Sequence, residues 1–165
     1  MKTPNLDRTL RKFAEAVVEE AQRNIGATRT VDGKKRRTDS TGKLRESLKW
    51  TYKNKRLFFG SDDSTSDYAG VVEYGRTPGR RQPPTDAILE WIKKKPIRLR
   101  DETGAFTKST PAKQRALAYL IARKIGKEGT EGILYYNRAL NKMFGKWSDR
   151  IADACLEDID ININL

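Results

Sequence analysis

The sequence contains no histidine and a single cysteine, and both scarcities exclude chemistry. Without histidine, the chain of 165 residues can form neither a Ser-His-Asp nor a Cys-His nucleophilic site, and no imidazole can bind a metal ion. Cys155 alone can form neither an internal disulfide nor a thiolate zinc site. We therefore expect neither a conventional hydrolase nor a zinc module, and we expect no metal and no cofactor.

Long apolar runs are also missing. No stretch approaches the roughly 18 apolar residues of a membrane span, and Met1 to Asn5 lead into an amphipathic segment instead of the apolar core of a signal peptide. We expect no membrane contact and a protein made in the reducing cytoplasm. The length fits a single domain, 1–165, with one hydrophobic core.

Positive charge, by contrast, is abundant and unevenly placed. The chain has 34 Lys and Arg against 22 Asp and Glu, a net charge of +12. Residues 26–100 carry 19 basic and 9 acidic residues, whereas 146–165 carry 2 and 5. Long-range potentials attract polyanions and complementary protein surfaces alike. The asymmetry favours either a surface that faces nucleic acid or self-association of unlike surfaces.

Apolar residues that recur at steps of three or four predict several amphipathic helices. Thr3-Pro4 and Thr110-Pro111 are helix-start signals, because a hydroxyl can cap the first turn and a proline there loses no hydrogen bond. Residues 68–75 also fit a short helix. The longer predicted helices cover about 4–25, 85–95, 111–126 and 134–158.

Alternating residues predict a β-hairpin at about 48–60. Leu48, Trp50 and Tyr52 alternate with polar residues, and Asn54-Lys55 supplies the turn. The tail 159–165 also alternates with a period of two, so we expect a strand that adds to a sheet of this chain or of a neighbouring one. About four helices packed with a small antiparallel sheet make an α+β fold.

Two segments without periodicity, 27–40 and 76–84, predict basic loops, and the first also fits a loosely held hairpin tip around an Asp-Gly turn. Mobile Lys and Arg side chains neutralise phosphates without reading base edges. The loops therefore favour sequence-independent contact with nucleic acid, and solvated loop charge is the alternative. Lys93 to Lys95 form a third basic cluster. The candidates for DNA contact are Lys34, Lys35, Arg36, Arg37, Arg76, Arg80 and Arg81.

One fragment fits metal-dependent nuclease chemistry. Asp32-Gly33-Lys34 has an acid-x-Lys spacing that could hold a divalent ion, with Asp62 or Asp63 as a further ligand. Matches of three residues arise by chance in a chain that is 34% charged, and this one falls in a predicted loop. An ordinary turn is the favoured interpretation. Neither a GxxxxGK nor a GxGxxG phosphate loop occurs.

Aromatic residues are predicted to lie mostly in the core, because they are not interleaved with the cations as in a single-strand binder. Tyr135-Tyr136 fits either core packing or the anchoring of a partner. The aromatic residues expected in the core are Trp50, Tyr52, Phe58, Phe59, Trp91 and Trp147.

Several short strings follow one another in a fixed order. Thr41-Gly42-x-Leu44-Arg45-x-Ser47-Leu48 precedes the hairpin, which ends in Gly60-Ser61, and Tyr68-Ala69-x-x-Val72-Glu73-Tyr74-Gly75 follows with a Thr77-Pro78 loop. Further strings are Ala87-Ile88-Leu89-x-Trp91-Ile92-x-x-Lys95, Ile121-Ala122-Arg123-Lys124-Ile125-x-x-x-Gly129-Thr130 and Tyr135-Tyr136-x-x-Ala139-Leu140. Over Thr41 to Leu140 the chain thereby resembles the small head–tail joining (neck or tail-completion) proteins of tailed double-stranded DNA bacteriophages.

Two departures from that family pattern concern loops. Arg76 stands between Gly75 and Thr77, where the family has Gly-Thr, and Leu134 lacks the proline that usually precedes the late aromatic residue. The order of the strings is unaffected.

The resemblance implies a structural virion component that is not an enzyme and that is assembled in the host cytoplasm. It implies a homo-oligomeric ring, commonly six- or twelve-fold, between the portal-bound connector and the tail proteins, with double-stranded DNA passing through the lumen. Head-to-tail rings need two unlike surfaces per subunit, which a basic middle and an acidic end supply. A sequence-nonspecific nucleic-acid-binding protein is the alternative. The candidate interface residues are Tyr68, Glu73, Tyr135, Tyr136, Asp153, Glu157 and Asp158, and buried packing is the alternative for Tyr68 and Tyr74.

Overall fold

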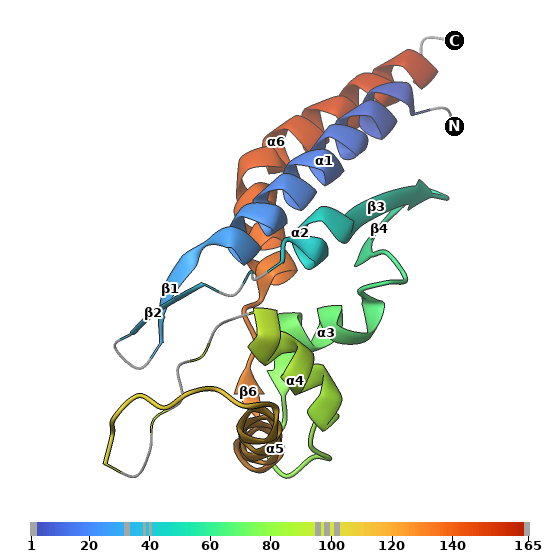
Figure 1. Ribbon diagram of the computed structural model, residues 1–165. Coiled ribbons are helices and arrows are strands. Elements are labelled where there is room, and N and C mark those ends of the chain that lie inside the picture. Colours follow the sequence, from blue (N-terminus) through green and yellow to red (C-terminus); the bar gives the residue numbers. More distant parts are fainter. Residues whose placement is uncertain are drawn as a thin grey trace. The chain divides into compact units, whose positions relative to one another are not determined.

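The computed structural model describes residues 3–31, 34–37, 39, 41–94, 97, 100 and 103–163. Within these ranges the fold is α+β, with six helices and short antiparallel strand pairs, which confirms the predicted class (Figure 1). Residue contacts divide the chain into two compact units. Unit 1 comprises Met1–Glu73 and Ile133–Leu165, and unit 2 comprises Tyr74–Gly132. Two such units are compatible with one domain, so the single-domain prediction stays a prediction.

The core of unit 1 is built on two long antiparallel helices, α1 (Pro4–Gly26) and α6 (Tyr135–Ile163), which lie side by side (Figure 1). Both were predicted, and the spacing of their apolar residues explains why they pair. Side chains three and four residues apart share one helix face, so each helix presents a continuous apolar stripe to the other. The buried residues of this seam include Phe13, Val17, Ala21 and Ile25 of α1 and Tyr135, Ala139 and Met143 of α6.

The first turn of α1 is capped from the far end of the chain. The Asp158 carboxylate of α6 is fully buried and accepts hydrogen bonds from the backbone N–H groups of Asn5 (3.1 Å) and Leu6 (2.8 Å). The predicted hydroxyl cap is wrong, because Thr3 makes no side-chain cap and instead donates its hydroxyl to Asp7 at 3.2 Å. An anion at a helix N-terminus satisfies unpaired donors and the helix dipole together, so this contact joins the ends of α1 and α6.

The predicted strand at 159–165 is wrong over the part that the structure describes. Helix α6 continues to Ile163, and the last two residues lie outside the described residues. A strand needs a partner for its backbone groups, whereas each residue added to an existing helix gains its own hydrogen bond. The period-two pattern of this segment was therefore outweighed by continuation of a helix that had already formed.

The predicted loop at 27–40 contains a second hairpin, β1 (Thr28–Val31) and β2 (Lys34–Arg37), which pair in antiparallel register. The loop prediction is wrong there, and the paired strands agree with the alternative of a hairpin, whose Asp-Gly turn lies outside the described residues. Arg29 anchors β1 to the rest of unit 1, because its guanidinium donates hydrogen bonds to the carbonyls of Ile133 (2.8 Å) and Asn24 (3.3 Å). Burial lowers the pKa of this side chain.

Helix α2 (Lys43–Ser47) leads into the predicted hairpin, β3 (Leu48–Lys53) and β4 (Arg56–Ser61). Asn54 and Lys55 form its two-residue turn with φ of 52° and 59°, the left-handed conformation that such turns require. Phe59 packs against the core while the side chain of Phe58 is 53% exposed, so the core prediction for Phe58 is wrong. Successive strand residues face opposite sides, so only one of the two can point inward.

Helix α3 (Ser66–Tyr74) confirms the short helix predicted at 68–75. In unit 2, strand β5 (Gly75–Arg76) pairs with β6 (Thr130–Glu131), and the chain between them forms α4 (Thr85–Lys94) and α5 (Pro111–Glu128). Both helices were predicted, and Thr110 accepts a capping hydrogen bond from the N–H of Lys113 at 3.3 Å. Residues 77–84 have no regular structure, in agreement with the predicted loop.

Unit 2 has few buried apolar side chains for its size. Ile92 of α4 and Ala118 and Ala122 of α5 are its buried hydrophobic residues among those described, and Trp91, which was predicted to lie in the core, is 38% exposed. Gly129 closes the unit with φ of 72°, and a Cβ at this position would lie 2.2 Å from the carbonyl oxygen of Arg76. Only glycine fits such an approach.

Candidate functional site

Glu73, Tyr135 and Tyr136, which belong to two of the strings described above, meet at one junction in unit 1, at the start of α6. The strings at 87–95 and 121–130 lie in unit 2. The buried carboxylate of Glu73 in α3 accepts hydrogen bonds from the N–H groups of Tyr136 and Asn137, both at 3.0 Å. The N–H of Leu134 binds the carbonyl of Glu73 at 2.9 Å. Glu73 therefore caps α6 in the way that Asp158 caps α1, and its charge is engaged inside the unit.

Tyr135 and Tyr136 belong to the same junction. Tyr135 is 2% exposed and its hydroxyl donates to the carbonyl of Ala69 at 3.3 Å. The hydroxyl of Tyr136 donates to the carbonyl of Gly60 at 2.8 Å, and burial raises its pKa. Of the two interpretations given to this pair, the structure supports core packing, with the polar tips tying α6 to α3 and to β4.

Ser47, a residue of the first string, also makes hydrogen bonds that stabilise the fold. The hydroxyls of Ser47 and Thr65 share a hydrogen bond of 2.6 Å, and both side chains are buried. The hydroxyl of Ser47 also donates to the carbonyl of Leu44 at 2.8 Å. Thr65 was not singled out from the sequence, and a threonine directly before a short helix gives little signal. Together with the bonds of Glu73 and Tyr135, these contacts fix α2, α3 and the start of α6 against one another.

The interface candidates divide into buried and exposed residues. Glu73, Tyr135 and Asp158 are buried and bonded within unit 1, so their side chains are not presented to a neighbouring subunit. Tyr136 is half-buried. The candidates that remain at the surface are Tyr68, which is 39% exposed, together with Asp153 and Glu157. Tyr74, for which packing was the alternative, is 76% exposed.

The basic candidates lie on a hairpin and on a loop. Lys35 is exposed on β2, and the side chains of Lys34, Arg36 and Arg37 lie outside the described residues. In the 76–84 loop Arg76 is half-buried and donates to the carbonyl of Arg81 at 3.1 Å, which leaves Arg80 and Arg81 as its exposed cations.

The third basic cluster is described only in part. Lys93 pairs with Glu90 at 3.4 Å on the surface of α4, Lys94 is exposed, and Lys95 lies outside the described residues.

The nuclease fragment is not described, since Asp32 and Gly33 lie outside the described residues. Its suggested partner Asp62 accepts hydrogen bonds from the hydroxyls of Ser64 (2.6 Å) and Thr65 (3.2 Å), which lower its pKa. This carboxylate organises the turn before α3. Across the described part of the chain, no three His, Cys, Asp or Glu side chains come together as a metal site.

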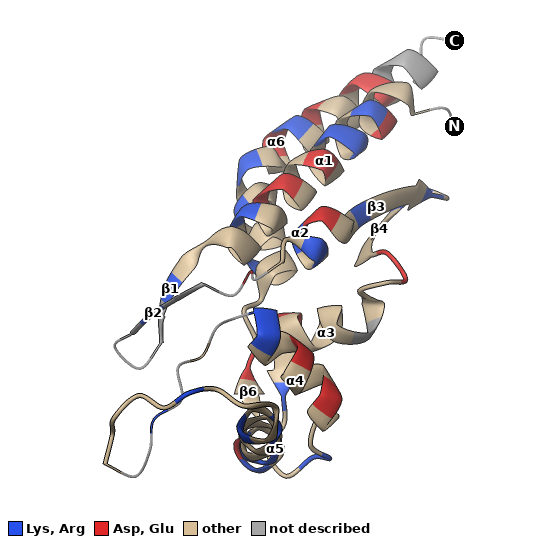
Figure 2. Ribbon diagram, in the orientation of Figure 1, with Lys and Arg blue, Asp and Glu red and all other residues tan. Residues whose placement is uncertain are grey.

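A larger separation of charge appears when the two units are compared. Unit 2 contains 14 Lys and Arg against 6 Asp and Glu, a surplus of eight, so it holds most of the net charge of +12 in 59 residues. Helix α5 contributes five of these cations, Lys113, Arg115, Arg123, Lys124 and Lys127, all exposed (Figure 2). None of them was among the contact residues predicted from the sequence, because only the apolar stripe of this helix was considered there.

The end of α6 carries the opposite charge. Asp149, Asp153 and Glu157 are exposed and follow one another at intervals of four residues, which places them in one row along the helix. None of the ion pairs found among the described residues includes them. Arg150, their neighbour, lies over the ring of Trp147 at 5.3 Å from its centroid.

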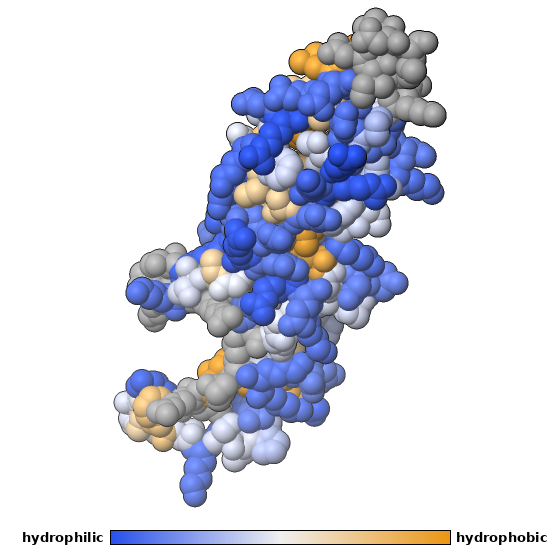
Figure 3. Space-filling model, turned by 90° about the horizontal axis from the view of Figure 1, so that it is seen from above, coloured by the Kyte–Doolittle hydropathy of each residue, from blue (hydrophilic) through white to orange (hydrophobic). Residues whose placement is uncertain are grey.

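Large apolar side chains are exposed beside both charged rows. Leu120 of α5 is 58% exposed, with Tyr119 next to it in the chain at 49%, and Leu156 of α6 is 59% exposed. The face seen in Figure 3 is otherwise mostly hydrophilic, with apolar residues in small patches. Single exposed leucines are ordinary, but these two lie within rows of opposite charge.

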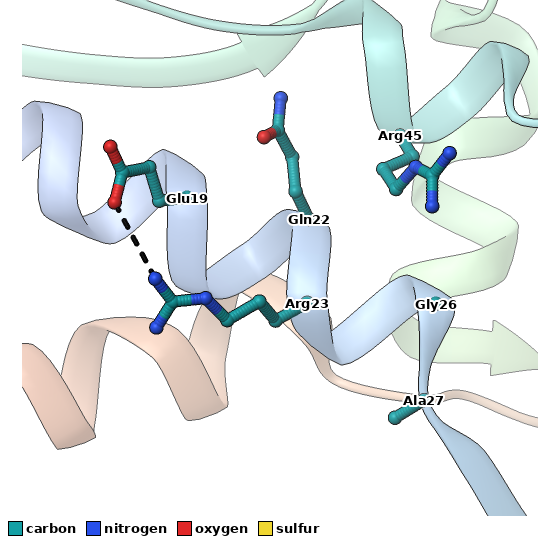
Figure 4. A pocket seen from close by; sticks show the side chains of 6 residues that line it. All are labelled: Glu19, Gln22, Arg23, Gly26, Ala27 and Arg45. Carbon is teal, nitrogen blue, oxygen red and sulfur yellow. Dashed lines mark ion pairs between the residues drawn. The ribbon is translucent and has the colours of Figure 1, made fainter.

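One open pocket of about 530 Å³ lies at the end of α1 in unit 1 (Figure 4). Its cations are engaged within the chain, because Arg23 pairs with Glu19 at 3.7 Å and Arg45 pairs with Asp39 at 3.6 Å. The other residues that line it are Gln22, Gly26 and Ala27. The lining contains no nucleophile paired with a base, so the pocket offers a polar surface without a catalytic arrangement.

A half-buried ion pair joins α1 and α6 near this pocket. The Glu20 carboxylate, which is 5% exposed as a residue, accepts a hydrogen bond from Lys142 Nζ at 2.5 Å and a second from Arg23 at 3.3 Å. The hydrogen bond from Lys142 lowers the pKa of Glu20. The pair fixes the register of the two helices.

No helix in the described part of the chain combines the length and the apolarity that crossing a bilayer demands. Comparison with known protein families, with curated proteins and with solved structures finds no match to this chain.

Proposed function

We propose that this protein is a structural subunit of a tailed bacteriophage, which assembles head to tail into a ring in the neck that joins the portal connector to the tail around the DNA channel. In this proposal the chain performs no chemistry and acts by oligomerisation and docking. The phage assignment rests on the resemblance of residues 41–140 to head–tail joining proteins. The ring rests on the separation of charge described above.

The single observation that carries the ring is the pair of unlike surfaces on one chain. Unit 2 has a surplus of eight positive charges, and the end of α6 presents a row of three exposed carboxylates. When two complementary surfaces of one chain contact two different neighbours, association is head to tail, and such contacts close into a ring or extend into a filament. Like charges would meet if two identical faces paired, so a symmetric dimer through either surface is disfavoured.

The contacts of the family strings give further support. Glu73 and Tyr135 join α3 to α6, and Ser47 joins α2 to Thr65 directly before α3. A chain that resembles the family at these positions is therefore expected to resemble its fold there. The exposed cations Lys35, Arg80 and Arg81 suit a lumen that passes DNA, because they neutralise phosphates without sequence preference.

Electron microscopy of the purified chain and of phage particles tests this proposal. We expect closed rings of uniform size from the purified protein, and we expect the chain in the neck of the virion. A chain that stays monomeric at every concentration and is absent from particles would refute the proposal.

A second candidate function is sequence-nonspecific binding of nucleic acid, which the surplus of eight charges in unit 2 favours. It is tested by measuring the affinity for duplex DNA at two salt concentrations. The ring proposal predicts weak binding that disappears at physiological salt, since contacts to phosphates alone are strongly salt-dependent. A tight complex that survives physiological salt would favour the second candidate.

A further inference from the structure

We propose that the basic face of α5 in one subunit binds the acidic row of α6 in a second copy of this chain, and that this contact is the repeating interface of the ring. The inference rests on the proposed function and adds the two surfaces and their residues.

The basic face of α5 is defined by what the helix buries. Ala118 and Ala122 face the interior of unit 2. At 3.6 residues per turn, the opposite face carries Leu120 at its middle. Around Leu120 lie the exposed cations Lys113, Arg123, Lys124 and Lys127. From Lys113 to Lys127 this face is about 21 Å long at 1.5 Å per residue.

Most of these cations are available to a partner. Lys124 pairs with Glu128 at 3.6 Å, but both side chains are largely exposed, at 72% and 58%, and an exposed pair of this kind is easily exchanged. Lys113, Arg123 and Lys127 take part in none of the ion pairs found within the described ranges.

The acidic row of α6 lies opposite to the side that packs on α1. Ala154 and Asp158 are buried against the partner helix. Asp149, Asp153 and Glu157 occupy the outer side, with Leu156 exposed among them. The row is about 12 Å long, so it fits within the length of the basic face.

The two faces match in both charge and apolarity. Each has a leucine surrounded by charges of one sign, so leucine can meet leucine while Lys and Arg meet Asp and Glu. Interfaces commonly combine an apolar centre with a polar rim. Charge complementarity adds speed and specificity to such a contact.

DNA is the other anion that could use the basic face. A DNA backbone would engage the cations but would leave Leu120 (58% exposed) and Tyr119 (49% exposed) without an apolar partner. The acidic row of a second copy covers the apolar residues and neutralises the charge together. For this reason the observations favour a second copy over DNA.

Charge reversal on each face tests the proposal with full-length protein. One variant carries Arg123→Glu and Lys127→Glu, and the other carries Asp153→Lys and Glu157→Lys. A matched control, Lys53→Glu with Arg56→Glu, changes the charge by the same amount at an exposed cross-strand pair of the β3/β4 hairpin. Circular dichroism establishes that each variant is folded, and native mass spectrometry measures its assembly.

We expect native protein and control to form the same assembly, and each reversed variant alone to be monomeric. In an equal mixture of the two reversed variants, the native α5 face of one meets the native α6 row of the other, and the two reversed faces are complementary in the opposite sense. The mixture should therefore assemble again, with the two variants alternating in equal numbers. A single chain that carries both reversals should assemble again, since the charges are then complementary in the opposite sense.

Different failures have different meanings. If the native chain assembles and both reversed variants still assemble, the proposed interface is wrong while the proposed function stands. The same holds if the α5 variant loses weak binding to duplex DNA without losing assembly, because the basic face would then be a DNA surface. If the native chain does not assemble at any concentration, the proposed function itself is wrong.

Discussion

Replacing Asp158 by alanine should destabilise the protein more than any other change of a carboxylate on α6. The side chain is fully buried and its carboxylate accepts the N–H groups of Asn5 and Leu6 at 3.1 and 2.8 Å. A hydrogen bond to a charged group contributes about 1.5–3 kcal/mol, and loss of an N-cap costs about 0.5–2 kcal/mol. Because the two bonds share one carboxylate and are not additive, we expect a loss of about 2–4 kcal/mol in the free energy of unfolding.

Urea denaturation followed by far-UV circular dichroism measures that loss. Asp158→Asn keeps one oxygen acceptor and should lose about half as much. Glu15→Ala, at an exposed position of α1, is the control and should change stability by no more than about 0.5 kcal/mol. Hydrogen exchange of the Asn5 and Leu6 amides should become faster in Asp158→Ala. If Asp158→Ala were as stable as the Glu15→Ala control, the cap would not stabilise the contact between α1 and α6.

Three further changes test other parts of the account. Lys142→Met leaves the Glu20 carboxylate with less compensation and should cost about 1–3 kcal/mol at neutral pH. Because the pKa of Glu20 is lowered in the folded state, the difference in the free energy of unfolding between Lys142→Met and native protein should be largest above the ordinary pKa of 4.5 and should shrink as the pH falls below it. A difference that grows in acid would contradict this. Gly129→Ala should lower the free energy of unfolding by about 1–3 kcal/mol and speed proteolysis of unit 2, since a Cβ there meets the carbonyl of Arg76. Unchanged proteolysis would show that the backbones of Gly129 and Arg76 do not approach so closely. The Tyr52 hydroxyl donates to Asp7 at 2.6 Å, and the pKa of Tyr52 is raised to about 12. Tyr52→Phe should therefore remove a phenol that titrates near pH 12, as followed by ultraviolet absorbance. Loss of a phenol that titrates near pH 10 would contradict this.

The sequence was sufficient to place the helices because their signals are local. The apolar steps of α1, the Thr110-Pro111 start of α5 and the Asn54-Lys55 turn each depend on residues close together in the chain. Helix caps supplied by residues distant in the sequence could not be predicted from such local signals. Asp158 binds the N–H of Asn5 across 153 positions of sequence, and Glu73 caps α6 across 63. Nothing local distinguishes these carboxylates from exposed ones.

The candidate site was predicted less well, for a related reason. Residues that resemble a family motif were taken as interface candidates, but Glu73 and Tyr135 are buried and hold the fold together. The cations of α5 were overlooked because predicted helices were examined only for their buried apolar stripe, and only predicted loops were examined for charge. Which charges gather on one surface is decided by packing, and the helix face opposite Ala118 and Ala122 becomes visible only when the buried side is known.

The mass of the purified chain in solution tests the central claim most directly. Native mass spectrometry, repeated over a range of protein concentrations, should give one closed assembly whose mass is six or twelve times the 18.8 kDa of the chain. Each charge-reversed variant alone should stay at the mass of one chain, and an equal mixture of the two should regain the assembly. A single species of 18.8 kDa at every concentration would contradict the account.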